Sequence, residues 1–120
     1  MLQKILVVDD EKLILKAVER SLSKVGYRVS GASNMEDLGT ALVAAPFDLL
    51  ITDIHLAEVT VDEVIQRVRE GSPSVKIMMM SGSYQKERSL DFIEKPFSIK
   101  ELRQKVKDIL SDDPSMRSDS

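Results

Sequence analysis

The sequence predicts an α/β fold in which a parallel sheet of buried strands carries helices on both faces. Short apolar runs alternate along the chain with segments whose apolar residues recur at helical spacing. Such alternation implies strand–helix–strand units with right-handed crossovers. Two of the apolar runs, residues 4–8 and 47–52, lead directly into aspartates. A carboxylate at the carboxyl end of a buried parallel strand lies where open α/β sheets place their ligand sites.

Composition indicates one compact domain. The chain has 120 residues, enough for a single hydrophobic core, and its net charge is −3. That charge gives no reason to expect binding to nucleic acid or to a membrane surface. The sequence contains no cysteine, which excludes disulfides and thiolate chemistry and fits a reducing compartment. No signal-peptide pattern and no apolar run of membrane-spanning length are present, so we expect a cytoplasmic protein.

The amino-terminal half predicts two strand–helix units. Residues 4–8 form the first strand, and a helix of about four turns follows, with Gly26 as its C-terminal glycine. Residues 27–32 alternate weakly and predict an edge or half-covered strand. Residues 33–36 match a capping box that opens the second helix, which Pro46 ends. The apolar stripes of the two helices are Ile14, Val18, Leu22 and Val25, and Leu38, Ala41, Leu42 and Ala45.

The carboxyl-terminal half predicts three strands and two helices. The central strand, residues 47–52, leads to a helix opened by a capping box at residues 60–63. Residues 75–80 and 90–94 predict two further strands, and Ser98 caps the last helix. The apolar faces of these helices are Val61, Val64, Ile65 and Val68, and Leu102, Val106, Ile109 and Leu110. The domain is thus expected to span residues 1–111, followed by a polar tail or the start of a linker over 112–120.

Three aspartates are expected to meet at one edge of the sheet. Asp9 and Asp10 follow the first strand, and Asp53 ends the central strand. Carboxylates at close range raise one another's pKa, and an oxygen-rich cluster of this kind suits Mg²⁺ before Ca²⁺. Taken singly, each aspartate is better explained as a helix cap or a loop residue, since aspartate is a common N-cap. The three together favour a metal site.

Four motifs, in this order, resemble the receiver domain of two-component response regulators. They are Val7-Val8-Asp9-Asp10-Glu11 at the first strand, Asp53 ending the third, Ser81 after the fourth, and Lys95-Pro96-Phe97 after the fifth. The resemblance covers residues 3 to 111. It implies a flavodoxin-like, doubly wound five-stranded parallel sheet of order 2-1-3-4-5. The active site is then expected at the carboxyl ends of strands one, three, four and five.

The resemblance implies a metal-dependent phosphoacceptor. Asp53 is expected to take a phosphoryl group from a histidine kinase or phosphotransfer protein, or from acetyl phosphate. Mg²⁺ is the expected cofactor, held by Asp10 directly, by Asp9 mostly through water, by Asp53, and by the backbone carbonyl of His55. The His55 side chain is expected to influence water access instead of binding the metal. The chain is accordingly expected to be no enzyme in the usual sense, and to catalyse only its own phosphorylation and dephosphorylation.

The resemblance also implies a conformational switch. Lys95 is expected to pair with Asp53 and, after phosphorylation, with a phosphoryl oxygen, and the peptide bond from Lys95 to Pro96 is expected to be cis. Ser81 would turn its hydroxyl toward the phosphoryl group, and Phe92 would move inward, in a shift between two existing conformations. The alternative for Phe92 is an ordinary core aromatic.

The sequence departs from the usual receiver pattern in three places. Ala57 stands where the family usually has proline, and Val61 where it usually has glycine. Only 13 residues separate Ser81 from Lys95. Residues 83–89 carry no apolar stripe, so we expect the fourth helix to be shortened or missing and the segment to be mobile. The symmetric dimer that uses the fourth helix, fifth strand and fifth helix is then not expected.

Two other functional classes stay open on the sequence alone. One is a binding module that keeps the fold but works without phosphorylation, although the complete set of site residues argues against it. The other is a hydrolase of the haloacid dehalogenase type, which has a second aspartate two positions after the first, where this chain has His55. The sequence names neither the kinase nor the output partner. It contains no DNA-binding element, so we expect no nucleic-acid or membrane contact by this domain.

Overall fold

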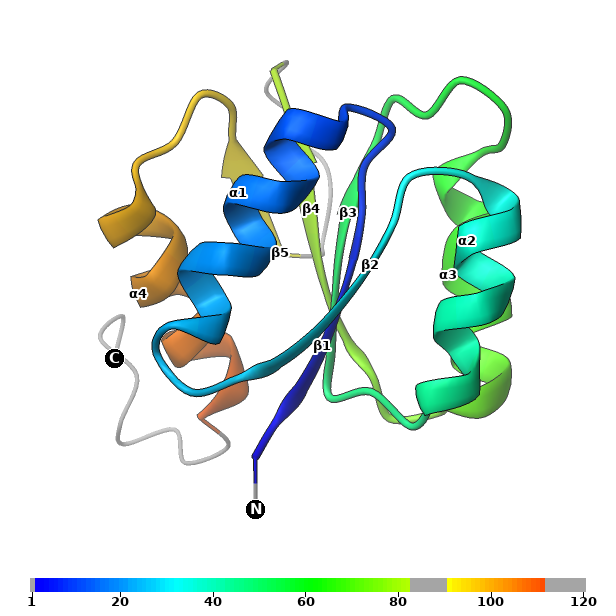
Figure 1. Cartoon of the computed structure of the whole chain (residues 1–120), viewed down its shortest axis with the longest axis horizontal. Coiled ribbons are helices and arrows are strands. Elements are labelled where there is room, and N and C mark those ends of the chain that lie inside the picture. Colours follow the sequence, from blue (N-terminus) through cyan, green and yellow to red (C-terminus); the bar gives the residue numbers. More distant parts are fainter. Residues whose placement is uncertain (1, 83–90, 112–120) are drawn as a thin grey trace.

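The computed structural model describes residues 2–82 and 91–111 (Figure 1). Strands and helices alternate along these ranges, as the sequence predicts. In chain order the elements are β1 (Lys4–Val8), α1 (Lys12–Ser23), β2 (Arg28–Ala32), α2 (Met35–Ala41), the 3-10 turn η1 (Leu42–Ala44), β3 (Leu49–Asp53), α3 (Val61–Gly71), β4 (Lys76–Ser81), β5 (Asp91–Glu94) and α4 (Ile99–Leu110).

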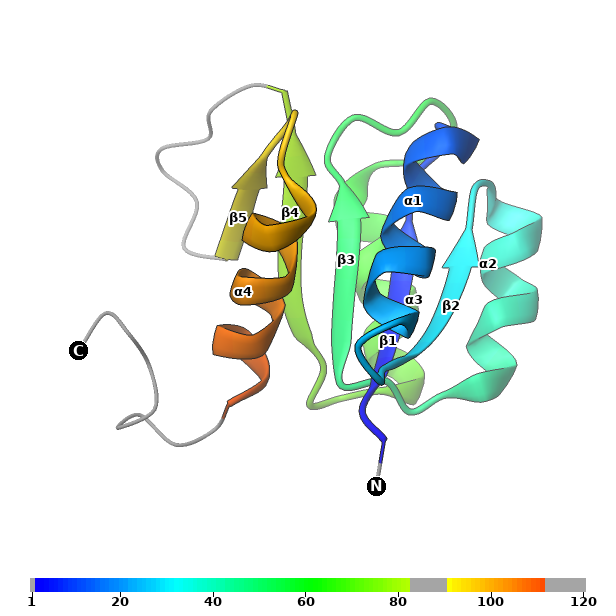
Figure 2. The ribbon, with the colours of Figure 1, turned by 60° about the vertical axis from the view of Figure 1, so that its left-hand side comes forward.

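The five strands form one parallel sheet of order β2-β1-β3-β4-β5, which confirms the predicted topology. All the strand arrows point the same way in Figure 2. Strand β3 lies at the centre and is buried along its whole length, whereas β2 lies at an edge and is only partly buried. Burial on both faces explains why the central strand is a continuous apolar run.

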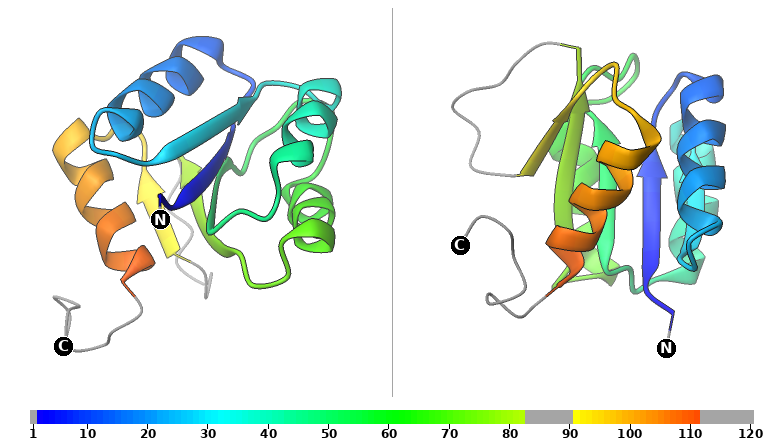
Figure 3. Two further views of the ribbon diagram at one scale, coloured as in Figure 1. Left: turned by 60° about the horizontal axis from the view of Figure 1, so that its bottom comes forward. Right: turned by 90° about the vertical axis from the view of Figure 1, so that its left-hand side faces the viewer.

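Helices cover both faces of the sheet. The left-hand view of Figure 3 shows the sheet between the pair α1 and α4 and the pair α2 and α3. Because side chains alternate along a strand, each strand supplies both cores. Ile5 and Val7 pack with α1 and α4, while Leu6 and Val8 pack with α2 and α3. The two apolar cores leave the carboxyl ends of the strands as the place where polar side chains gather.

Side-chain caps mark the beginnings of three helices, and the predicted cap of α4, Ser98, accepts a hydrogen bond from the Glu101 amide. Helix α3 starts at the predicted capping box, in which Thr60 and Glu63 each accept a hydrogen bond from the other's backbone amide. The capping box predicted at residues 33–36 is wrong. The N-cap of α2 is Asn34, whose side-chain oxygen accepts from the Asp37 amide at 2.8 Å. The asparagine oxygen reaches the third residue onward, so the helix begins one residue later than predicted.

The first helix ends before its apolar stripe does. Its last residue is Ser23, and Val25 is 49% exposed instead of buried. Gly26 has a φ of 103°, a backbone conformation that favours glycine, and the turn there leads the chain into β2. The second predicted helix is also interrupted, because α2 ends at Ala41 and η1 follows.

Some predictions fall on residues outside the described ranges. Residues 83–90 include the segment expected to be mobile, and residues 112–120 are the predicted tail. The described residues form four α-helices around the five strands, in keeping with a fourth receiver helix that is shortened or missing. The expected lack of a dimer through that region stays a prediction. Within the described ranges, no helix has the length and apolar character needed to span a membrane.

Candidate functional site

The carboxyl ends of β1 and β3 bring three carboxylates together. Side-chain oxygens of Asp9, Asp10 and Asp53 lie within 4.8 Å of one another. The pairing of β1 with β3 sets Val8 opposite Thr52, so the residues that follow emerge at the same edge of the sheet. Asp9 and Asp53 are buried, whereas Asp10 is exposed. The cluster is therefore closed toward the core and open to solvent at Asp10.

Lys95 supplies the positive charge of this cluster. Its Nζ atom lies 2.9 Å from Asp9 Oδ2 and 3.1 Å from Asp53 Oδ2. The lysine follows β5, and its backbone amide donates to the Ser81 carbonyl oxygen at 2.7 Å. The peptide bond from Lys95 to Pro96 is cis. The structure thus places the lysine between two carboxylates, while the sequence had suggested only the contact with Asp53.

Burial and charge together set the protonation of these groups. Burial raises the pKa of Asp9 above its usual value, although hydrogen bonds from the Glu11 amide and from Lys95 act to lower it. Burial alone would lower the pKa of Lys95, but the hydrogen bonds and charges of Asp9 and Asp53 outweigh this effect and raise it. One ammonium among three carboxylates leaves an excess of negative charge. This excess, and the all-oxygen donor set, fit a hard divalent cation such as Mg²⁺.

Three backbone amides orient the carboxylates. The Glu11 amide donates to Asp9 Oδ1 at 2.9 Å, and the His55 amide donates to Asp53 Oδ1 at 3.0 Å. The Ala57 amide donates to Asp10 Oδ2 at 3.1 Å. A proline at residue 57 could not make this bond, because it has no N–H group. Because residue 57 is alanine, its amide can connect the loop after β3 to Asp10 in the loop after β1.

Glu11 has a place at the site that the sequence analysis did not assign. Its Oε1 atom lies 3.5 Å from Lys95 Nζ, and its amide holds Asp9. It also stands at the N-cap position of α1, where its side chain makes no capping hydrogen bond. In the sequence, the signal for this role was the position of Glu11 directly after the two aspartates. In the structure it is exposed at the start of α1.

Ser81 and His55 contact residues of this cluster, whereas Phe92 pairs in register with Met79 within the sheet. Ser81 ends β4, is fully buried, and pairs in register with Glu94 of β5. Phe92 is partly buried and packs against the core formed with α2 and α3. His55 is exposed, and its backbone amide, not its ring, contacts Asp53. Chemically, the site offers a carboxylate nucleophile beside a cation, which suits transfer of an anionic group.

Comparison with known proteins shows which family this chain is similar to. The family model described as the response regulator receiver domain matches residues 5–107. The transcriptional regulatory protein DltR of Streptococcus agalactiae is 32% identical over 112 residues, which cover 87% of this chain and 50% of that protein. The chain spans 22%, 58% and 50% of the first three curated relatives, so it corresponds to only part of those proteins.

Solved structures show the same fold. The receiver domain of the hybrid histidine kinase CckA is similar with a TM-score of 0.76 and 31% identity, covering 90% of this chain and 99% of that one. The chemotaxis protein CheY4 of Vibrio cholerae has a TM-score of 0.80 and 26% identity, covering 91% and 99%.

Proposed function

Because the chain belongs to the response regulator receiver domain family, we propose that Asp53 is the residue that accepts the phosphoryl group, and that a histidine kinase donates it. One observation carries the assignment to Asp53. Its carboxylate lies 3.1 Å from the Lys95 ammonium, in a cluster with Asp9 and Asp10. Receiver domains act as phosphoacceptors in two-component signalling and pair with histidine kinases. We propose which residues of this chain carry out the phosphoryl transfer.

The proposed reaction forms an acyl phosphate. A carboxylate oxygen of Asp53 attacks the phosphorus atom of the donor's phosphohistidine. The phosphorus–nitrogen bond breaks as the new phosphorus–oxygen bond forms, and the electron pair returns to the imidazole. The Lys95 ammonium, already held beside Asp53, neutralises negative charge on the transferred group.

Asp9, Asp10, Asp53 and the backbone carbonyl of His55 are the groups proposed to hold Mg²⁺. When bound, the ion supplies positive charge to the phosphoryl oxygens. The Glu11, His55 and Ala57 amides keep the three carboxylates oriented for this task. Asp10 is exposed, which leaves a route for the donor and, afterwards, for the water that hydrolyses the acyl phosphate. Such self-catalysed dephosphorylation is part of the proposal.

The proposed response to phosphorylation begins at Lys95 and Ser81. The new phosphoryl group would pair with the Lys95 ammonium and attract the Ser81 hydroxyl. Phe92 on β5 would then move inward. The direct backbone bond from Lys95 to Ser81 supports a linked movement of the ends of β4 and β5. Relatives are named as transcriptional regulators, but the output partner of this chain and its cytoplasmic location stay predictions.

Phosphorylation by acetyl phosphate in the presence of Mg²⁺, read by intact mass, tests the assignment. Wild-type protein and the Asp62→Asn variant, altered at an exposed aspartate of α3, are expected to gain one phosphoryl group. Asp53→Asn is expected to gain none, and chelation of Mg²⁺ should abolish labelling of the wild type. Undiminished labelling of Asp53→Asn would refute the assignment.

A further inference from the structure

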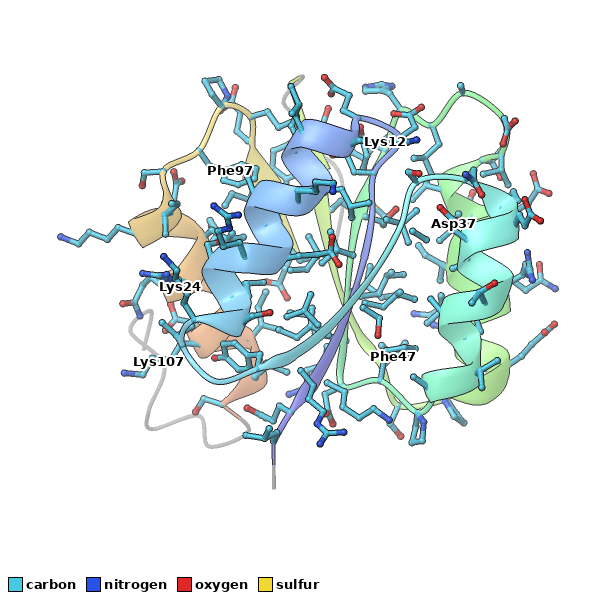
Figure 4. The ribbon with its side chains drawn as sticks, in the orientation of Figure 1. Lys12, Lys24, Asp37, Phe47, Phe97 and Lys107 are labelled. Atoms are coloured by element: carbon cyan, nitrogen blue, oxygen red, sulfur yellow. The ribbon has the colours of Figure 1, made fainter. Side chains whose placement is uncertain are left out.

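A hollow of about 240 Å³ lies beside the carboxylate cluster, on the side of the sheet that carries α2 and α3. Its lining comes from β1, from α2 and the two residues before it, from loop residues 56–59, and from α3. Figure 4 labels Asp37 near the amino-terminal end of α2, where the loop after β3 also passes. Of the three clustered carboxylates, only Asp10 is part of the lining.

Apolar side chains form the floor of this hollow. Val8, Leu38 and Val64 are buried and come from β1, α2 and α3 respectively. Partly buried apolar residues complete the wall, and they are Met35, Leu56 and Val59. The volume lies below the range of about 300–1,000 Å³ that is usual for drug-sized ligands. The hollow therefore suits the apolar part of a ligand smaller than these.

Two polar residues at the rim are already paired within the chain. The Ser33 hydroxyl and the Asn34 side-chain amide each donate to Asp37 Oδ2, at 3.3 Å. The Asn34 side-chain oxygen accepts from the Asp37 amide at 2.8 Å. The other polar side chains of the lining are the carboxylates of Asp10 and Glu58, and both residues are exposed. The described lining contains no lysine, arginine or histidine, so its charge is negative.

The Asp10 carboxylate is held at the rim by the loop after β3. Its Oδ2 atom accepts from the Ala57 amide at 3.1 Å, and both residues belong to the lining. Proline, which is usual at this position in receiver domains, could not donate this bond. A carboxylate has about four lone-pair sites, so Asp10 can accept further hydrogen bonds from a ligand. The alanine at residue 57 thus gives this chain a fixed anionic group beside an apolar floor.

We propose that this hollow binds a small organic cation that consists of an apolar body and a primary ammonium group. The apolar body would contact Leu38, Val64 and the other floor residues, and the ammonium would lie between Asp10 and Glu58. An ammonium has three N–H donors and can serve both carboxylates. Asp10 is also a proposed ligand of Mg²⁺, so the organic cation and the metal would compete. Only this competition rests on the proposed function.

Other classes of ligand fit the hollow less well. An anion would meet Asp10 and Glu58, and also Glu36 and Asp37 in the first turn of α2. A neutral apolar molecule would displace water from the carboxylates without replacing the lost hydrogen bonds. A bare metal ion would leave the apolar floor without a partner. An ammonium on an apolar body satisfies both parts of the lining.

A titration with 2-phenylethylammonium tests the proposal. The uncharged 2-phenylethanol and the anionic 3-phenylpropionate carry the same phenylethyl group and serve as controls. Binding is followed by amide NMR shifts at pH 7, with EDTA to remove Mg²⁺. We expect saturable shifts at Leu38, Ala57 and Val59 with the ammonium compound. The alcohol should bind at least about fivefold more weakly, because it lacks the charge that pairs with two carboxylates, and the anion should show no saturable binding.

Two variants that each lose one charge provide a matched comparison. Glu58→Gln removes a carboxylate of the lining, whereas Glu70→Gln removes one from an exposed position of α3 outside the lining. Glu58→Gln is expected to weaken binding of the ammonium compound by about twofold to threefold, which is the usual size of an exposed ion pair. Glu70→Gln should leave the affinity unchanged.

A third variant changes the space and keeps the charge. Val59 is partly buried and packs against the core that forms the floor, so Val59→Phe places a larger side chain in the hollow. The ammonium compound is expected to lose its saturable binding to this variant. Thermal unfolding, together with wild-type amide shifts on α1 and α4, establishes that the variant is folded.

Magnesium is expected to compete with the ammonium compound. Saturating MgCl₂, compared with NaCl at matched ionic strength, should weaken binding by at least about fivefold, because both cations use the Asp10 carboxylate. Amide shifts at Asp9 and Asp53 report Mg²⁺ binding separately. If Mg²⁺ causes no shifts there, the proposed metal site is refuted, and the titration in EDTA still decides the ammonium site.

Several results would overturn the proposal. They are the absence of saturable shifts, equal or tighter binding of the alcohol or the anion, and an equal loss of affinity in Glu58→Gln and Glu70→Gln. Shifts centred on α1 and α4 would also overturn it. So would unchanged binding to folded Val59→Phe, or unchanged binding in the presence of Mg²⁺ that has shifted the Asp53 amide.

Discussion

The backbone amide of Lys95 donates a hydrogen bond of 2.7 Å to the carbonyl oxygen of Ser81, while the Lys95 side chain contacts Asp9 and Asp53. Ser81 ends β4, and Lys95 directly follows β5. One residue therefore links the ends of two strands to each other and to the carboxylate cluster. We therefore expect a change of charge at Asp53 to act directly on Lys95 and, through the Lys95 backbone, on the end of β4.

Replacing Lys95 with alanine is expected to destabilise the Mg²⁺-free protein by about 2–4 kcal/mol, because the fully buried Asp9 loses its cation. Mg²⁺ is expected to restore much of this loss by neutralising the same carboxylates. Urea denaturation with and without Mg²⁺ measures both effects. Lys100→Ala, at an exposed position of α4, is the control and should change stability by less than about 0.5 kcal/mol. A loss that Mg²⁺ leaves unchanged would contradict this account.

Replacing Asp10 with asparagine is expected to weaken Mg²⁺ binding by at least about tenfold, since changes that only orient metal ligands already cost that much. Asparagine keeps an oxygen that can accept the Ala57 amide, so the loop should stay in place. Without Mg²⁺ the variant should be as stable as the wild type or more so, because repulsion within the cluster falls. Melting temperatures across a MgCl₂ titration, with NaCl at matched ionic strength, measure the difference.

Glu19 is expected to make stability depend on pH. Its carboxyl group lies so close to Gly31 that a Cβ atom there would stand 2.7 Å from Glu19 Cδ. Burial raises the pKa of Glu19 above 4.5, and Lys16 only partly offsets this effect. The folded protein therefore holds the proton more tightly than the unfolded chain. The contribution of the Glu19 carboxyl group to stability is complete below pH 4.5. It is lost as the pH rises through the higher pKa that this group has in the folded protein.

Glu19→Gln should accordingly be more stable than the wild type at pH 7, and the difference should be much smaller at pH 4.5 and vanish below it. Urea denaturation at the two pH values measures it. Glu70→Gln, at an exposed position of α3, removes the same charge and is expected to show a smaller, pH-insensitive effect. A larger gain at pH 4.5 than at pH 7 would show that the sign is wrong.

Two glycine substitutions are expected to act in opposite directions. Gly26→Ala should destabilise the fold by about 1 kcal/mol, because its φ of 103° strains any residue with a Cβ atom. Gly39→Ala should stabilise it by about 0.5–1 kcal/mol, since Gly39 lies inside α2 and, among the described residues, a Cβ atom there meets only Arg67 Nη2, at 3.7 Å. Thermal unfolding of both variants compares them directly. Equal effects would show that the backbone at Gly26 relaxes without cost.

Local sequence signals predicted the elements because strand and helix periodicities are properties of neighbouring residues. The apolar run that ends at Asp53 is buried on both faces, as its composition indicated. The capping box at Thr60 and Glu63 is present as predicted, because its hydrogen bonds join residues only three positions apart. Near residue 34 the signal was ambiguous, because Ser33 and Asn34 are both good caps, and only the path of the backbone selected Asn34.

By itself the sequence determined the fold class and the meeting of Asp9, Asp10 and Asp53, since parallel strands end at a common edge. The tertiary structure decided the contact between Lys95 and Asp9, which lie 86 positions apart, and the hydrogen bond from Ala57 to Asp10. It also decided that Ile99 and Arg103 face Ala17 and Ser21 across a crevice. Periodicity describes one element at a time, whereas these contacts depend on how the elements pack against one another.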